Sequence, residues 1–269
     1  MTKLNIRKPA VAGQFYSSSA AELKKQIEGF IDPAAEKKDA IACMLPHAGY
    51  MFSGPVAGAT ISRVKIKETC LLLGPNHTGY GRPFSLMSKG IWQTPLGDVQ
   101  INEKLAENIL GQSEYLEEDE LGHIHEHSLE VELPFLQFFR KDLKIVPIAI
   151  ATQDLQALKD VGKAIASAIK KEDCLIVASS DMSHYLPQKE AEKKDTLAID
   201  AILELDENKL MQRIRQYDIS MCGYAPAIVM LSAAKAMGAK KAELVKYQTS
   251  GDIIGDHSSV VGYAGIIVY

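Results

Sequence analysis

The sequence lacks the features that mark membrane, secreted and nucleic-acid-binding proteins. It has no run of about 20 apolar residues, the length that a membrane-spanning helix needs. Its first residues, MTKLNIRKPAVAGQFY, contain no apolar stretch like that of a signal peptide. It also has no block of Lys and Arg, and its net charge is -4. We therefore expect a cytoplasmic protein that binds neither nucleic acid nor membrane.

Cysteine is scarce as well. The 269 residues contain four cysteines, and none belongs to a CxxC pair. In a reducing compartment we expect thiols rather than disulfides. Cys43, Cys70 and Cys174 lie in or at the start of apolar runs, so we predict that they are small core residues. Cys222 has a different setting, described below.

Linkers, internal repeats and low-complexity tracts are also missing, so we predict a single domain over residues 1–269. Short apolar runs alternate with segments of helical periodicity. This pattern is typical of a three-layer α/β/α fold with a central, mostly parallel or mixed sheet. The apolar runs are continuous, as expected for strands that are covered on both faces. The predicted strands are 40–45, 69–73, 143–150, 174–179, 243–248 and 261–268. The predicted helices are 20–30, 54–63, 102–110, 128–139, 154–170, 188–204, 207–216 and 222–237.

Three details of this prediction can be checked separately. Asn102 is a candidate N-cap of the helix at 102–110. Pro134 is expected to kink or end the helix at 128–139. Pro147 places the strand at 143–150 near an edge or an irregularity of the sheet, because proline cannot donate to a ladder of hydrogen bonds.

Polar residues follow three of the predicted strands. His47 comes just after the strand at 40–45, His77 after the strand at 69–73, and the segment Ser180-Asp181-Met182-Ser183-His184 after the strand at 174–179. In open α/β sheets, ligands bind beyond the carboxyl ends of the strands. Each residue also has a structural reading. The histidines could sit in turns or cap helices, and Asp181 could cap a following helix with His184 one turn on.

Cys222 opens the apolar helix predicted at 222–237. Unpaired backbone N–H groups and the helix dipole favour thiolate at such a position, and thiolate is the form that binds metal. The alternative is a buried capping thiol. Two imidazoles and a thiolate are good ligands for iron, zinc or copper, and three protein ligands are typical of a catalytic site.

Three histidines crowd the segment Gly122–Glu130. His127 and Glu130 are three residues apart and would share a helix face. They could form an acid/base pair or support a metal ligand, or they could be structural. The positions of His123 and His125 give no strong geometric reason to place them in the site.

At these residues the sequence resembles the Memo family. The matching segments run through nearly the whole chain in order: PAVAGQFY (9–16), PHAGYMFSGPVAG (46–58), LLGPNHTG (72–79), TPLGDV (94–99), EHSLEVELPFLQ (126–137), SSDMSHY (179–185), CGYAPA (222–227) and GDHSSVVGYAGI (255–266).

The resemblance implies a fold similar to class III extradiol dioxygenases, which are non-haem iron enzymes. It implies that His47, His77 and Cys222 stand where those enzymes hold metal, with Asp181, His184 and His127 lining the same pocket. The third ligand of those enzymes is a carboxylate, and Cys222 replaces it here. The resemblance also links the chain to metal and redox chemistry, to phosphotyrosine peptides and, in microbes, to a radical-SAM protein partner.

Three hypotheses follow. In the first, His47, His77 and Cys222 bind one iron(II) or copper(I) ion, with zinc as a third option, in an oxidoreductase that acts on an unknown small molecule. Asp181 would then orient a ligand or water, and His184 or His127 would move protons. In the second, a retired enzyme fold binds a peptide or small molecule as an adaptor. The third is hydrolysis by zinc-bound water. The absence of a GxSxG motif disfavours a serine nucleophile.

Overall fold

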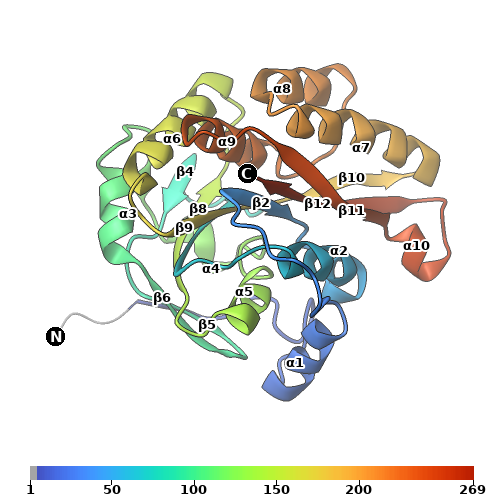
Figure 1. Cartoon of the computed structure of the whole chain (residues 1–269), viewed down its shortest axis with the longest axis horizontal. Coiled ribbons are helices and arrows are strands. Elements are labelled where there is room, and N and C mark those ends of the chain that lie inside the picture. Colours follow the sequence, from blue (N-terminus) through green and yellow to red (C-terminus); the bar gives the residue numbers. More distant parts are fainter. Residues whose placement is uncertain (1–4) are drawn as a thin grey trace.

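A long twisted sheet runs through the protein (Figure 1). The computed structural model describes residues 5–269. In this range the 12 strands join in the order β1-β5-β6-β8-β3-β9-β2-β12-β10, with β11 paired to β12, and β4 paired to β7 and β8. The strands are β1 (Ile6–Arg7), β2 (Ala42–Leu45), β3 (Thr69–Pro75), β4 (Phe84–Leu86), β5 (Ile91–Thr94), β6 (Gly97–Ile101), β7 (Glu117–Glu118), β8 (Lys144–Ile150), β9 (Cys174–Ser179), β10 (Asp181–Leu186), β11 (Ala242–Thr249) and β12 (Val260–Val268).

The centre of the sheet is parallel and buried. Strands β8, β3, β9 and β2 pair in parallel, and β12 joins β2 in the antiparallel sense. Every residue of β2, β3 and β9 is buried, which confirms that these strands are covered on both faces. Because these strands are parallel, their carboxyl ends meet at one edge of the sheet. The segments that follow them therefore lie close together.

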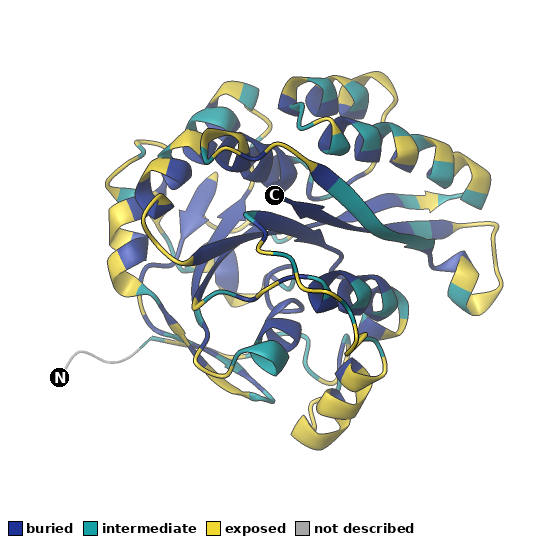
Figure 2. Cartoon of the chain, viewed as in Figure 1, coloured by how far each residue is buried: buried dark blue, intermediate teal, exposed yellow. Residues whose placement is uncertain are grey.

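Helices cover both faces of the sheet (Figures 1 and 2). Helix α9 packs on β3 and β9 and also contacts α6 and α8, while α2 packs with α1 and α5 and against β2, β11 and β12. The predicted mixed α/β class is confirmed. No helix in residues 5–269 has the length and apolar composition that a membrane crossing needs. The helices are α1 (Ala20–Glu28), α2 (Tyr50–Ser62), α3 (Glu103–Leu110), α4 (Leu121–Ile124), α5 (Leu133–Phe139), α6 (Leu155–Ile169), α7 (Gln188–Leu203), α8 (Glu207–Gln216), α9 (Tyr224–Ala236) and α10 (Gly251–Ile254).

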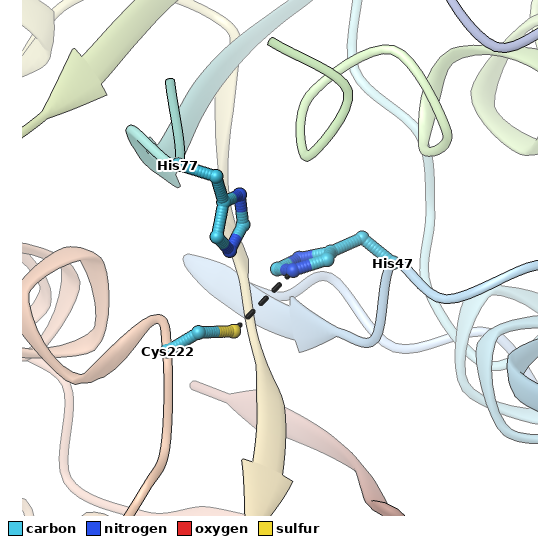
Figure 3. A group of neighbouring side chains, drawn as sticks. All are labelled: His47, His77 and Cys222. Carbon is cyan, nitrogen blue, oxygen red and sulfur yellow. Dashed lines mark hydrogen bonds between the residues drawn. The ribbon is translucent and has the colours of Figure 1, made fainter. Parts of the chain in front are cut away.

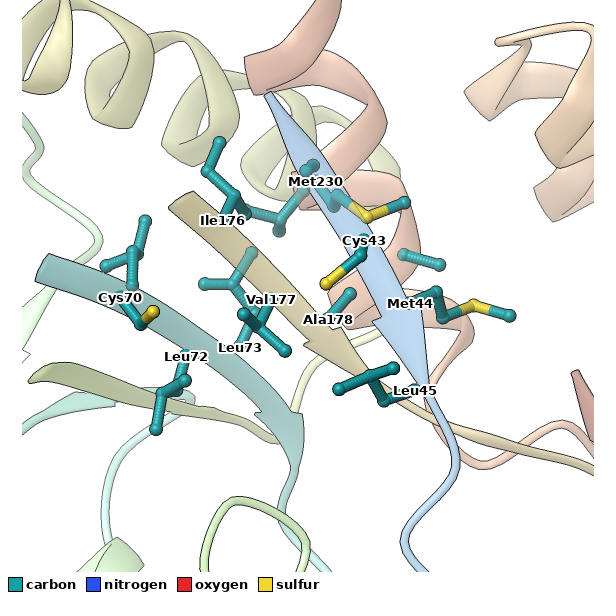
Figure 4. Packing of buried hydrophobic residues seen from close by; sticks show 14 of the residues in the cluster. Cys43, Met44, Leu45, Cys70, Leu72, Leu73, Ile176, Val177, Ala178 and Met230 are labelled. Carbon is teal, nitrogen blue, oxygen red and sulfur yellow. The ribbon is translucent and has the colours of Figure 1, made fainter. Parts of the chain in front are cut away.

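The core between β2, β3, β9 and α9 contains the three cysteines predicted there. Figure 4 shows Cys43 and Cys70 among the aliphatic side chains of these strands, with Met230 of α9 above them. Cys43 and Cys70 are fully buried and Cys174 is 6% exposed. All three are free thiols. Residues 1–4 lie outside the described residues, so the assignment of one domain to residues 1–269 stays a prediction.

The predictions made for the two prolines have different outcomes. Helix α5 begins at Leu133, so the prediction of a helix from residue 128 is wrong. Pro134 lies in its first turn, where a missing N–H is tolerated, and therefore starts the helix instead of breaking it. Pro147 lies at an irregularity, as predicted, but not in an edge strand. The outer partner of β8 changes from β6 at Ile145 to β4 at Ile148, on either side of Pro147.

Several short strands were not predicted. Strands β5 and β6 form a hairpin, and β4 and β7 have three and two residues, which is too short for a periodic signal. No strand was predicted at 181–186, but β10 forms there, pairs with β12 and has register shifts on both sides of His184. Asn102 caps α3 as predicted, because its side chain accepts a hydrogen bond from the backbone N–H of Leu105.

Candidate metal centre

His47 lies just beyond β2 and is almost fully buried, with 2% of its surface exposed. Its backbone N–H donates to Asp181 Oδ1 at 2.8 Å. Its ring Nδ1 lies 2.7 Å from Ser179 Oγ, and its Nε2 lies 3.3 Å from Cys222 Sγ. Both ring nitrogens therefore have neighbours, and Nε2 points toward the thiol.

His77 lies just beyond β3, the second neighbour of β2 across β9. Its Nδ1 lies 2.9 Å from Glu126 Oε1, and about a third of its side chain is exposed. The other carboxylate oxygen of Glu126 accepts the backbone N–H of His77. Glu126 therefore holds both the backbone and the ring of His77, and leaves Nε2 of the ring free to face the site.

Cys222 lies just before α9, and its sulfur faces the two histidines (Figure 3). The N-cap of the helix is Gly223, whose backbone N–H donates to Ser180 Oγ at 3.0 Å. A Cβ at Gly223 would lie 2.2 Å from Ser179 O, so only glycine lets this turn approach β9. The expectation that Cys222 opens the helix is wrong by two residues.

The donor atoms of His47, His77 and Cys222 all lie within 4.8 Å of one another. Figure 3 shows that they converge from β2, from β3 and from the start of α9. The structure thus brings together the three residues that the sequence suggested as ligands. This distance is short enough for one ion to contact all three after small side-chain rotations.

The electrostatic settings of the three residues differ. Burial, with smaller effects of His77 and His127, lowers the pKa of His47 well below its usual value, so the ring is neutral. Burial alone would lower the pKa of His77, but the hydrogen bond to Glu126 and the charges of Glu126 and Asp181 together outweigh this effect, so the net shift of the pKa is upward. Burial, reinforced by the charge of Asp181, raises the pKa of the Cys222 thiol. This direction is opposite to the sequence-based expectation of a thiolate.

Asp181 and His184 lie on β10. The alternative that Asp181 caps a helix is wrong, because residues 181–186 form a strand. Asp181 instead fixes the backbone of His47, and burial raises the pKa of its carboxyl to about 6. The His184 ring is held by Ser220 O, 2.8 Å from its Nδ1. The charge of His184 acts on both His47 and Asp181, so the ring lies close to the site without joining the three donors.

His127 belongs to the site, but Glu130 does not. The His127 ring stacks on His77 at 4.8 Å between centroids and lies 5.5 Å from the His47 ring. Residues 128–132 form turns, so the expected helix face shared by His127 and Glu130 is wrong. Glu130 points away to the segment at 7–16. There it pairs with Arg7 and accepts the Tyr16 hydroxyl at 2.6 Å.

Glu126 is the site residue that sequence analysis missed. Its Oε1 accepts the backbone N–H groups of His127 and Ser128, both at 2.9 Å, in addition to its contacts with His77. Burial disfavours its ionised form, but these hydrogen bonds prevail and hold the pKa of Glu126 at about 2. His77, Glu126 and His127 also form a group with metal-ligand spacing. Because N–H donors already occupy the Glu126 oxygens, we interpret this group as support for His77.

Comparisons with known proteins agree with this description. A family model described as "Memo-like protein" matches residues 7–267. The chain is 46% identical to a "MEMO1 family protein" of Aquifex aeolicus over 268 residues, which cover 98% of this chain and 99% of the relative. It is also 46% identical to a "MEMO1 family protein" of Methanococcoides burtonii, covering 98% of this chain and 100% of the relative.

Among the solved structures that are similar in fold is the crystal structure of an uncharacterised protein from Escherichia coli K12, with a TM-score of 0.53 and 14% sequence identity. The match covers 83% of this chain and 98% of that chain. At this level of identity the likeness concerns the fold alone.

Proposed function

The chain belongs to the Memo family, and from this premise we propose that it is a metal-binding protein with a redox role. In this proposal His47, His77 and Cys222 hold one iron(II) or copper(I) ion, with zinc as a third option. The observation that carries the proposal is the convergence of three donor atoms within 4.8 Å. We further propose that the protein works in the cytoplasm, where its thiols stay reduced.

The chemistry of the donors fits such an ion. Neutral imidazole suits iron, copper and zinc, and thiolate suits copper(I) and zinc. Nδ1 of each histidine is engaged, in His47 by Ser179 and in His77 by Glu126, so Nε2 of both rings is left for the ion. The Cys222 thiol is neutral in the metal-free protein, so binding would release its proton. Three protein ligands would leave coordination positions for a substrate.

The surrounding residues would bind, orient and move protons. Asp181 fixes His47 through the backbone, and with a pKa of about 6 its carboxyl can hold or release a proton near neutral pH. His127, stacked beside His77, and His184, held by Ser220, are the proposed proton carriers. When bound, iron or copper would supply Lewis-acid and one-electron chemistry, whereas zinc would supply Lewis-acid chemistry alone. The substrate is an unknown small molecule.

A second candidate function is binding without catalysis. It is favoured by Cys222, a residue that replaces the carboxylate expected from the resemblance and whose pKa is raised by burial. The pocket would then hold a peptide or small molecule, and binding would survive removal of metal. A radical-SAM protein partner stays a prediction under both candidates.

Metal content tests the first proposal. The protein is purified without oxygen or affinity tags and analysed for metals beside Cys222→Ala and His77→Ala. We expect about one equivalent of iron or copper in the wild type, and a loss in both variants, because each removes one of three ligands. Cys174→Ala is the matched control, since this buried thiol lies at the far end of β9 and should leave the metal in place.

Two outcomes would count against the proposal. If both ligand variants keep their metal, the ligand assignment is wrong. If the wild type contains no metal and takes up none from added Fe(II), Cu(I) or Zn(II), the binding function becomes the better explanation.

A further inference from the structure

Behind His47 a buried chain of hydrogen bonds leads away from the site. Ser179 Oγ lies 2.7 Å from His47 Nδ1, 2.8 Å from Ser128 O and 2.9 Å from Glu132 Oε1. Ser128 and Ser179 are 0% exposed, and Glu132 is 1% exposed. Among residues 5–269, the second oxygen of Glu132, Oε2, has no hydrogen-bond partner. These residues lie outside the three donors.

Counting hydrogens fixes the direction of each bond. Ser179 carries one hydroxyl hydrogen, and Ser128 O is a carbonyl that can only accept. That hydrogen therefore points to Ser128 O, because two oxygens at 2.8 Å repel each other without a hydrogen between them. The other two neighbours must then donate to Ser179 Oγ. They are the N–H of His47 Nδ1 and a proton on Glu132 Oε1.

We infer that Glu132 is a neutral acid that donates to Ser179 and, through it, fixes His47 with its proton on Nδ1 and its Nε2 lone pair directed at the metal. Glu132 and Ser179 are thus positioning residues, and this role rests on the proposed metal function. Without metal, the same arrangement lets Nε2 accept the thiol hydrogen of Cys222 at 3.3 Å. The two ends of the His47 ring are then consistent with one tautomer.

The surroundings of Glu132 support its neutral form. An ionised carboxylate with one unpaired oxygen in the core would carry a large desolvation penalty, whereas an unpaired carbonyl oxygen of a neutral acid carries a smaller one. The nearby Tyr50 hydroxyl donates to Val131 O and does not stabilise a charge on Glu132. Burial, reinforced by the charge of Asp181, raises the pKa of Glu132 well above its usual value.

The first experiment reads the tautomer without any metal. Full-length protein with 15N-labelled histidine is examined by long-range proton–nitrogen correlation, which shows which ring nitrogen carries the proton. In the wild type we expect His47 to be protonated at Nδ1. Glu132→Gln should keep this pattern, because its amide N–H donates as the acid does. Glu132→Met, of similar size but with no donor, should give a mixture of tautomers.

The second experiment measures the effect on the site with Co(II) as the probe. Titration followed by thiolate-to-cobalt absorption should show Glu132→Met binding about 10-fold more weakly than wild type, the lower end of what outer partners of ligands contribute. Glu132→Gln should restore most of that loss. Ser179→Ala, which removes the connection altogether, should lose as much as Glu132→Met and serves if the latter does not fold. Val177→Ala, a buried change in the same strand, controls for general loosening and should bind as wild type.

The outcomes separate this inference from the proposed function. If Glu132→Gln weakens Co(II) binding as much as Glu132→Met, or if wild-type His47 carries its proton on Nε2, the inference is overturned. If the wild type binds no Co(II), the proposed metal function fails. The nitrogen spectra still show which ring nitrogen of His47 carries the proton, and so they still test the inference about Glu132.

Discussion

His47 and His77 occupy equivalent places, each just beyond a parallel strand that flanks β9, yet their surroundings are opposite. His47 is buried, and a neutral serine hydroxyl contacts its Nδ1. His77 is partly exposed, and an ionised carboxylate contacts its Nδ1. Burial keeps the first ring neutral, whereas the carboxylate raises the pKa of the second. Position in the fold therefore brings both rings to the site, but it does not set their charge.

The same contrast divides Glu126 and Glu132, which belong to one short segment and are both about 1% exposed. Glu126 accepts three backbone N–H groups besides the ring of His77, and its pKa falls to about 2. Glu132 has the Ser179 hydroxyl as a neighbour of one oxygen, and its pKa rises. Burial disfavours charge on both carboxyls, but His77 and the backbone N–H groups lower the pKa of Glu126, whereas the charge of Asp181 adds to the effect of burial on Glu132.

Removing the charge of Glu126 tests most directly whether its ionised carboxylate stabilises the fold. Glu126→Gln places an amide N–H against the backbone N–H groups that the carboxylate accepts. We expect the free energy of unfolding to fall by about 3–5 kcal/mol, because several hydrogen bonds to a charged group, each contributing about 1.5–3 kcal/mol, are lost or weakened together. Urea unfolding of the metal-free protein measures this. Glu103→Gln, an exposed change at the start of α3, should stay within about 0.5 kcal/mol. A fall below about 1 kcal/mol in Glu126→Gln would contradict the role given to its charge.

His123 shows how burial alone changes the pKa of a histidine that lies outside the candidate metal site. It is fully buried outside the site, and its Nε2 faces Ser85 O at 3.0 Å, while its Nδ1 has no partner in the part of the chain that the structure describes. Burial lowers its pKa from 6.5 to about 4. Between these two pH values His123 is protonated in the unfolded chain but neutral in the folded chain. The free energy of unfolding therefore falls as the pH drops from about 6.5 to about 4. The loss is about 3 kcal/mol at the acid end.

The check on His123 is the slope of unfolding free energy against pH over this window. His123→Gln can still donate to Ser85 O but does not titrate, so its slope should be flatter than that of the wild type. Parallel slopes in the two proteins would show that burial of His123 does not oppose its protonation.

The smallest effect is expected at His127. It stacks on His77 but stands outside the three donors, so His127→Gln should keep Co(II) affinity within about threefold and stability within about 1 kcal/mol. Titration with Co(II) and urea unfolding provide both values. A 10-fold loss of affinity would instead show that His127 helps to hold the metal, as a ligand or as support for one, and the division between metal ligands and proton carriers would need revision.

Much of the fold could be predicted from the sequence because the central strands are continuous apolar runs. Strand β9 and helix α8 have the predicted bounds, and the cap at Asn102 is confirmed. Strand β10 could not be predicted, because its polar residues pair with β12 across a large separation in sequence. The turns before α5 were also missed, since Glu130 bonds to the segment at 7–16 rather than along a helix.

The site was predicted in part for a similar reason. Histidines just beyond parallel strands lie at the same edge of the sheet, so the order of elements made His47 and His77 candidates, and the resemblance to the Memo family favoured them over turn or capping residues. Glu126 and Glu132 carry no such signal. Their roles depend on which backbone N–H groups surround them, and those groups are placed by turns that have no sequence period. The prediction that Cys222 is a thiolate was wrong for a similar reason. Burial raises the pKa of the thiol by more than the start of the helix lowers it.

The three donors come from segments far apart in the sequence, so they are synthesised at different times. Cys222 follows His47 by 175 residues. At about 5–20 residues per second, a ribosome needs roughly 10–35 s to reach it. Through that interval β2, the strand that leads to His47, also lacks its neighbour β12. The nascent chain therefore displays two histidines long before it has the thiol, and the three donors first meet at a late stage of translation.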